Sequence, residues 1–118
     1  MFISNWNKQS KENKIINYLE TNTNTIYSIS ENTTVLGDYS FAHNTHLTEV
    51  TIPSTVTSIE YAAFYDCSNL QTVTFKETTQ PICHGEEFSG CHSSLIINVP
   101  SNYEGTTFCG KKVTKQKT

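Results

Sequence analysis

The chain has 118 residues, 36% of them hydrophobic, and a formal net charge of -3, which suits one small domain with a thin core. Serine, threonine and asparagine fill 41 positions, and these side chains compete with helical backbone hydrogen bonds, so strands and turns are expected. Arginine is absent and the middle is acidic, which excludes nucleic-acid binding, and no apolar run reaches the roughly 20 residues of a membrane span.

Residues 1–25 are expected to form an N-terminal cap segment. Two structures fit it: a helix over Lys8–Glu20, with Ile15, Ile16 and Leu19 on one side, or, almost as well, a strand over Lys14–Leu19. Either would cover the first strand of whatever follows. The first residues lack the apolar stretch and cleavage site of a secretory signal, which favours a cytoplasmic location.

Apolar residues then recur with a shift of 23 positions, which becomes 24 further along. Within each copy, three residues such as Val50–Ile52 alternate apolar and polar, which is typical of a half-buried strand. A segment such as Tyr61–Phe64 is predicted to form a single helical turn that points its phenylalanine inward. The aligned positions are Phe41, Phe64 and Phe88; Leu47 and Leu70; Val50, Val73 and Ile97; Ile52, Phe75 and Val99; and Cys67 and Cys91.

One such unit cannot bury its own apolar residues, whereas stacked units cover one another. The sequence therefore predicts a mostly β solenoid over residues 26–100, with about four turns of 23–24 residues and short parallel strands roughly 4.8 Å apart. An irregular loop is expected at Thr78–Pro81. Residues 101–118 should form a C-terminal cap and a basic tail that frays after Val113.

These residues resemble the BspA-like leucine-rich repeat. The resemblance implies a right-handed solenoid with a strand on one face and short strands or turns on the other. Members are mostly surface or secreted antigens of anaerobic bacteria and parasitic protists, so it also implies adhesion or protein binding, with no conserved reaction, and a surface or secreted location. The pattern is carried by Leu47-x-x-Val50-x-Ile52-Pro53, Val56-x-x-Ile59, Ala63-Phe64 and Cys67-Ser68-Asn69-Leu70-x-x-Val73-x-Phe75.

The cysteines and histidines allow three interpretations. Cys67 and Cys91 share one repeat position, which favours stacked core thiols. A disulfide is the second interpretation, and four cysteines permit three pairings. The third is a thiol-dependent metal or redox site, because cysteine and histidine are the ligands that zinc prefers. That site would use Cys83, His84, Cys91 and His92.

The predicted function is a non-catalytic protein–protein interaction module without a cofactor or metal. Its binding face is expected on the outward side of the strands, because solenoids bind through a repeated sheet face. Lysines near both ends could approach the acidic middle of a second chain, so weak self-association is also expected. One predicted column of the face contains Ser28, Thr51, Thr74 and Asn98, and a second contains Ile26, Glu49, Thr72 and Ile96.

Overall fold

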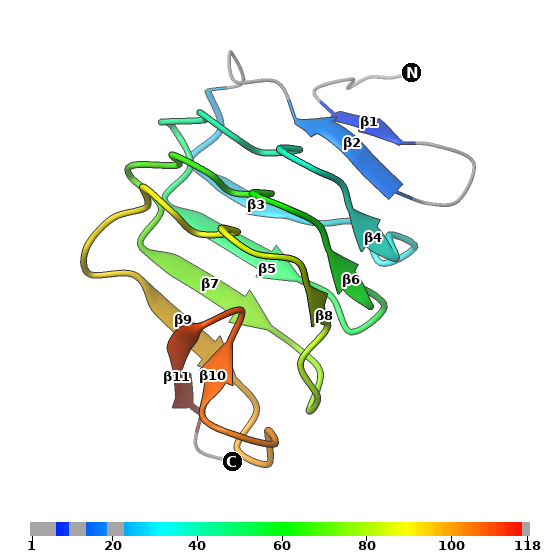
Figure 1. The fold of residues 1–118 in the computed structure, drawn as a ribbon, viewed down its shortest axis with the longest axis vertical. Coiled ribbons are helices and arrows are strands. Elements are labelled where there is room, and N and C mark those ends of the chain that lie inside the picture. The colour runs from blue at the N-terminus through cyan, green and yellow to red at the C-terminus, as the bar shows by residue number, and fades with distance from the viewer. Residues whose placement is uncertain (1–6, 10–13, 19–22, 117–118) are drawn as a thin grey trace.

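The computed structural model describes residues 7–9, 14–18 and 23–116. The described chain forms a β-solenoid that contains no helix, so the mostly β class is confirmed. It has about three turns, whereas about four were predicted. Two sheets face each other across the core (Figure 1). The long sheet has the order β10-β11-β9-β7-β5-β3, and the short sheet has the order β1-β2-β4-β6-β8.

The long sheet consists of β3 (Ile26–Ser28), β5 (Glu49–Ile52), β7 (Thr72–Phe75), β9 (Ile96–Val99), β10 (Thr107–Phe108) and β11 (Lys111–Lys115). The short sheet consists of β1 (Asn7–Gln9), β2 (Lys14–Tyr18), β4 (Val35–Leu36), β6 (Ser58–Ile59) and β8 (Ile82–Cys83). Successive turns of the solenoid pair in parallel in both sheets.

The strand register follows the sequence repeat. Ile52 pairs with Phe75, a shift of 23 residues, whereas Ser58 pairs with Ile82, a shift of 24. The extra residue therefore lies between Phe75 and Ile82, in the loop that contains the predicted irregular segment Thr78–Pro81. Because side chains alternate along a strand, an unbroken register keeps every apolar position on the core side of the sheet.

A column of phenylalanines forms the centre of the core. The rings of Phe41 and Phe64 stack with centroids 4.7 Å apart, and those of Phe64 and Phe88 stack at 5.3 Å. Phe108 of the C-terminal hairpin closes the column, 6.1 Å from Phe88 and 4.8 Å from Phe75. All five rings are buried, so the inward orientation predicted for the repeated phenylalanines is confirmed.

The prediction of a single helical turn around each phenylalanine is wrong. In the segment that contains Phe41, the N–H groups of Phe41 and His43 bond to carbonyls of the next turn, those of Ala63 and Tyr65. Tyr39 and His43 have positive φ, which a right-handed helix does not permit. On this third side of the solenoid, bonds between turns alternate with single i→i−3 bonds such as that from Ala42 to Tyr39, so no continuous helical turn forms.

The described part of the N-terminal segment contains two strands and no helix. β1 and β2 form an antiparallel pair, and β2 continues the short sheet by pairing in parallel with β4. Ile15 is fully buried, and Lys14 forms an ion pair with Glu60 at 3.0 Å. The helix over Lys8–Glu20 is thus wrong for the described part of that range, and the rest of it lies outside the described residues.

The C-terminal segment folds back as a hairpin over the last turn. β10 and β11 flank a two-residue loop, Cys109-Gly110, in which both residues have positive φ, as in the turns that suit tight hairpins. β11 pairs in parallel with β9 as far as Lys115, and Gln116 donates its backbone N–H to Val99. Fraying was expected after Val113, but these bonds hold the chain to Gln116.

Candidate interaction surfaces

The predicted binding residues lie in two straight columns on the outward face of the long sheet, the strand face. Ser28 pairs with Thr51, Thr51 with Thr74, and Thr74 with Asn98 across β3, β5, β7 and β9. The same strands align Ile26, Glu49, Thr72 and Ile96 in the second column. The register thus brings together all of the residues that the sequence placed on this face.

One strand-face residue was missed by sequence reasoning. Thr114 on β11 pairs with Asn98, so it extends the first column by one strand. The amide of Gln116 also donates a hydrogen bond to the Asn98 side-chain oxygen at 2.8 Å. The alternation in Lys112-Val113-Thr114 is the sequence signal for this strand, but its position beside the basic tail suggested fraying instead.

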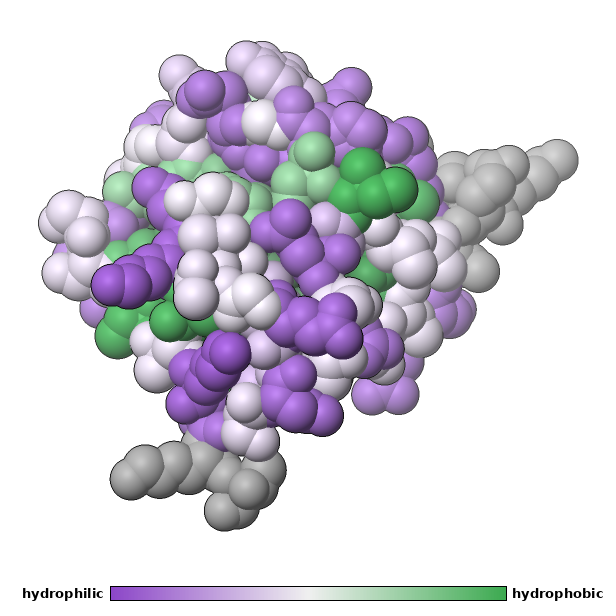
Figure 2. Space-filling view, turned by 60° about the horizontal axis from the view of Figure 1, so that its bottom comes forward, coloured by the Kyte–Doolittle hydropathy of each residue, from purple (hydrophilic) through white to green (hydrophobic). Residues whose placement is uncertain are grey.

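The strand face offers hydroxyl and amide groups between two exposed apolar ends. Ile26 is 64% exposed and Ile96 is 47% exposed, while Thr51, Thr72 and Thr74 are partly buried by their neighbours. Glu49 is the acidic residue of the two columns. This mixture of hydroxyl, amide and apolar groups suits contact with another polypeptide and provides no acid–base pair. Figure 2 brings the C-terminal end of the molecule forward and shows small hydrophobic patches among hydrophilic side chains there.

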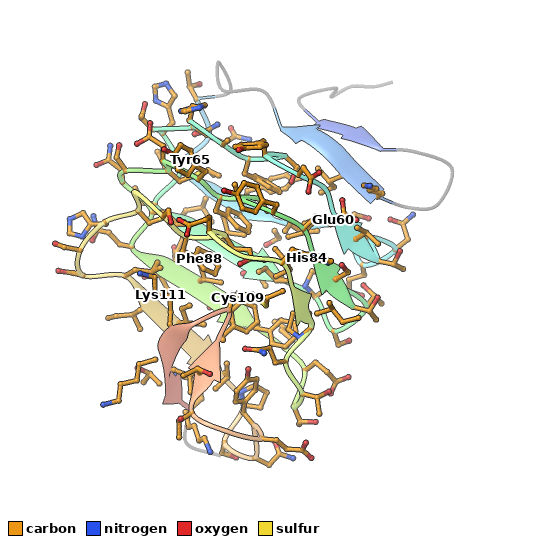
Figure 3. The ribbon with its side chains drawn as sticks, viewed as in Figure 1. Glu60, Tyr65, His84, Phe88, Cys109 and Lys111 are labelled. Carbon is orange, nitrogen blue, oxygen red and sulfur yellow. A yellow bond between two sulfur atoms is a disulfide. The ribbon has the colours of Figure 1, made fainter. Side chains whose placement is uncertain are left out.

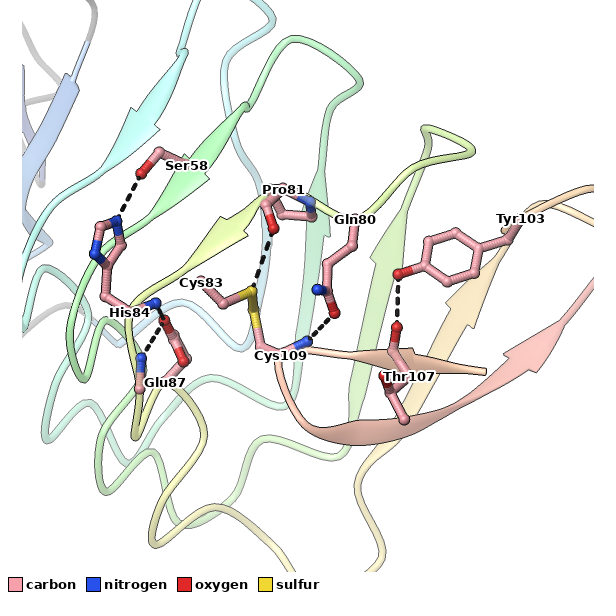
Figure 4. Close-up of a disulfide and its surroundings, with 10 residues drawn as sticks. Ser58, Gln80, Pro81, Cys83, His84, Glu87, Tyr103, Thr107 and Cys109 are labelled. Carbon is pink, nitrogen blue, oxygen red and sulfur yellow. Dashed lines mark hydrogen bonds between the residues drawn. A yellow bond between two sulfur atoms is a disulfide. The ribbon is translucent and has the colours of Figure 1, made fainter. Parts of the chain in front are cut away.

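The structure does not bring the cysteines and histidines of the proposed metal site together. Cys83 forms a disulfide with Cys109, with the Cα atoms 5.4 Å apart (Figure 4). The His84 ring contacts the Ser58 hydroxyl at 3.3 Å, and the His92 ring accepts the Ser94 N–H. Among the described residues, the one group with metal-ligating geometry is Cys83, Glu87 and Cys109, and its two sulfurs are bonded to each other.

The disulfide fastens the C-terminal hairpin to the short sheet. Cys83 lies on β8, whereas Cys109 lies in the hairpin loop, where its backbone N–H bonds to the Gln80 side chain at 2.8 Å. Buried Glu87 sits beside this link and accepts the backbone N–H groups of His84 and Gly85. These contacts explain the cluster as a structural fastening, so the metal or redox alternative has no support.

Cys67 and Cys91 are free thiols stacked on successive turns, as the repeat position predicted. The Cys67 sulfur donates to the Phe41 carbonyl at 3.0 Å, and the Cys91 sulfur donates to the Phe64 carbonyl at 3.3 Å. Burial raises the pKa of Cys67 to about 12 and that of Cys91 to about 11. Neither thiol is therefore a reactive thiolate near neutral pH.

A second surface, not found from the sequence, lies on the turns between the sheets. Tyr39, Tyr61 and Tyr65 form this tyrosine surface and are 51%, 43% and 39% exposed. Tyr65 is labelled at the turn side of the ribbon in Figure 3. The available signal was the position of these rings, since Tyr39 and Tyr65 flank inward-facing Phe41 and Phe64 in the sequence.

A shallow groove near β8 is too small for a typical ligand site. Its volume is about 190 Å³, below the roughly 300–1,000 Å³ of most small-molecule pockets. Its lining includes Glu77, Thr79 and Ile82, which form no nucleophile–base arrangement. The strand face and the tyrosine surface are therefore the stronger candidates for recognition.

Comparisons with known proteins agree with this architecture. No helix among the described residues is long and apolar enough to cross a membrane. Searches of curated proteins and of solved structures found no match. A family model described as BspA type Leucine rich repeat region (6 copies) matches residues 13–114, a span that includes β2 to β10 and most of β11. The chain therefore belongs to the BspA-type leucine-rich repeat family, whose repeats form protein-interaction modules.

Proposed function

We propose that this chain is a non-catalytic module that binds a protein partner through the strand face. The observation that carries the proposal is the unbroken register of the two outward columns across four parallel strands. Such a register aligns the hydroxyls of Ser28, Thr51 and Thr74 with the amide of Asn98. An extended partner thus meets a regular series of hydrogen-bonding groups. Exposed Ile26 and Ile96 add apolar contact at the two ends.

The proposal is tested by charging the centre of the face. In the double variant Thr51→Lys/Thr74→Lys, two cations occupy the middle of the hydroxyl column and should abolish partner binding. The matched control is Thr79→Lys/Thr106→Lys, which makes the same chemical change at two exposed loop positions. Circular dichroism should show that both variants keep the wild-type melting temperature to within a few degrees.

The readout is a comparison of the proteins retained on each immobilised variant from extracts of the native host. Proteins retained by the wild type and the control, but lost from the strand-face variant, are the expected result. Their binding should then be repeated with purified components by calorimetry. If the strand-face variant binds those purified proteins as tightly as the control does, the strand face is not the binding surface.

We further infer a surface or secreted location and a role in adhesion. Disulfides persist in oxidising compartments and are rare in the cytosol, so the Cys83–Cys109 link favours the former. The test is a thiol count on protein isolated from its native host under acid quench. Two free thiols per chain agree with the proposal, whereas four would contradict it and favour a cytoplasmic location.

A further inference from the structure

The rings of the tyrosine surface meet edge to face and form a corner, in which neighbouring ring planes are nearly perpendicular rather than stacked. The Tyr39 ring centroid lies 5.7 Å from that of Tyr61 and 6.2 Å from that of Tyr65. The ring planes meet at 72° and 76°, so neighbouring rings present their faces in different directions. The backbone bonds from Tyr39 to the Tyr61 carbonyl and from His43 to the Tyr65 carbonyl hold the two turns in place.

The third turn leaves this corner open. The repeat places Gly85 at the position of Tyr61 and Ser89 at the position of Tyr65, so small residues follow the large rings. A Cβ atom at Gly85 would lie 3.8 Å from the Tyr61 ring, which shows that the ring lies directly beside this backbone. No large third-turn side chain stands at these two positions, and Tyr61 and Tyr65 remain 43% and 39% exposed.

Carboxylates surround the rings. Asp38 accepts the Tyr61 backbone N–H at 3.0 Å, and Asp66 contacts the His43 ring at 3.0 Å. The pKa of Tyr61 is raised first by Tyr39, then by partial desolvation, and then by the nearby Glu86 carboxylate. Within the described residues, the one lysine in an ion pair is Lys14, with Glu60, so Asp38 and Glu86 have no lysine partner.

We propose that the tyrosine surface binds lysine or arginine side chains of an extended partner segment. Cations are attracted to the faces of tyrosine rings within about 6 Å of the centroid, and the surrounding carboxylates add attraction of the same sign. Alternate residues of an extended strand are roughly 6.6 Å apart, close to the 5.7 and 6.2 Å between rings. A segment with basic residues at alternate positions therefore fits the surface.

This surface is separate from the strand face in both position and chemistry. The strand face lies on β3, β5, β7 and β9, whereas the rings lie on the turns before β5 and β7. The chemistry also differs, because hydroxyl groups dominate one surface and aromatic rings with carboxylates dominate the other. Each surface can therefore be disabled without changing the other, and the two proposals can fail independently.

The probe is the peptide acetyl-Gly-Lys-Gly-Lys-Gly-amide, and its neutral control carries norleucine at both lysine positions. Binding is followed by the tyrosine ring signals in NMR spectra of the full chain. The lysine peptide should shift the signals of Tyr39, Tyr61 and Tyr65 with millimolar affinity, and raising the salt from 0.05 to 0.5 M should weaken binding severalfold. The norleucine peptide should produce no saturable shift.

The variants separate the cation–ring contact from general attraction. Tyr61→Leu should lower the affinity for the lysine peptide about two- to fivefold, because an exposed ring contributes that much to cation binding. Tyr61→Phe keeps the ring face and should bind within about twofold of the wild type. The strand-face variant Thr51→Lys/Thr74→Lys should leave the ring shifts unchanged.

Four results would overturn the proposal. Equal binding of the norleucine peptide would make the contact apolar rather than cationic. Full binding by Tyr61→Leu, with its fold verified by circular dichroism, would place the cation elsewhere. Ring shifts that change with protein concentration alone would show that a second copy of the chain occupies the surface. Absence of any shift up to about 10 mM lysine peptide would likewise refute it.

Discussion

The phenylalanine column is the most direct test of the repeat alignment, and Phe64→Ala is its sharpest perturbation. Phe64 is fully buried and stacks against rings on both sides, Phe41 at 4.7 Å and Phe88 at 5.3 Å. Truncating a buried phenylalanine costs about 3–5 kcal/mol. The upper half of that range is expected, because each lost ring pair adds roughly 0.5–1.5 kcal/mol beyond area burial.

The cost of Phe64→Ala is large relative to the free energy of unfolding of the whole chain. Typical stability of about 0.05–0.15 kcal/mol per residue gives a chain of 118 residues roughly 6–18 kcal/mol. Each kcal/mol shifts the melting temperature of a domain near this size by roughly 4 °C or more, so Phe64→Ala should melt at least about 15 °C below the wild type. Circular dichroism melts and urea titrations measure the change.

The neighbouring residue provides the control. Tyr65 is 39% exposed, so Tyr65→Ala should lower the free energy of unfolding by only about 1 kcal/mol or less. Phe64→Leu keeps most of the side-chain volume, so its free energy of unfolding should lie between those of Phe64→Ala and Tyr65→Ala. If Phe64→Ala melted within a few degrees of Tyr65→Ala, the column would not be core and the repeat alignment would be refuted.

Four further outcomes are expected. Replacing Cys83 and Cys109 with serine opens a link between residues 26 apart and should cost about 3.5 kcal/mol on loop entropy, measured by urea unfolding; equal stability would contradict this. Gly90→Ala brings a Cβ to 3.0 Å from backbone, whereas Gly105→Ala, also at positive φ, meets nothing within 4 Å, so Gly90→Ala should be the less stable variant by more than 1 kcal/mol. Burial raises the pKa of Cys67 from 9.0 to about 12, so its thiol loses a proton more readily in the unfolded chain. Its contribution to the free energy of unfolding is therefore complete below pH 9 and should fall by about 1.4 kcal/mol per pH unit towards pH 12. In urea titrations the stability of Cys67→Ala should decline less steeply over this pH range. Within the described chain β3 is an edge of the long sheet, and unpaired strand edges recruit strands, so light scattering should detect weak self-association near millimolar concentration, and a constant monomer mass would exclude it.

Much of the fold was predictable because the sequence repeat determines both the spacing of equivalent strands and their parallel pairing. Alternating residues such as Val50, Thr51 and Ile52 identify a half-buried strand, and the equivalent position one repeat later identifies its partner. Stacking then requires equivalent strands to pair, so the register of β5 with β7 follows from the alignment. The columns of the strand face were predictable for the same reason.

The turns were not predictable because their backbone gives little sequence signal. The aligned residues Tyr39, Ala62 and Glu86 all have φ near 55°, although none is glycine, the usual marker of that region. Bonds to the neighbouring turn hold these conformations, and such bonds exist only after stacking. A short segment with Ala62 and Ala63 therefore favoured a helical turn on local propensity alone.

The disulfide was unpredictable for a different reason. Cys83 and Cys109 occupy unrelated positions, one on a strand of the solenoid and the other in the loop of the C-terminal hairpin. Their pairing depends on how far the hairpin folds back over the last turn, which no periodicity specifies. The tight loop at Cys109-Gly110 was the local signal, because it returns the chain immediately after the cysteine.

Departures from the repeat carry the chemistry that distinguishes the tyrosine surface. Core positions must keep similar shapes from turn to turn, because each side chain packs on its equivalent in the neighbouring turns, as Phe41, Phe64 and Phe88 do. Outward positions carry no such constraint, so the position of Tyr61 is Asp38 in the turn before and Gly85 in the turn after. That variation puts a carboxylate on one side of the ring and a residue without a side chain on the other. These positions do not match between repeats, so a repeat alignment gives them no role. In the folded chain they bring the aromatic rings and carboxylates together on one surface.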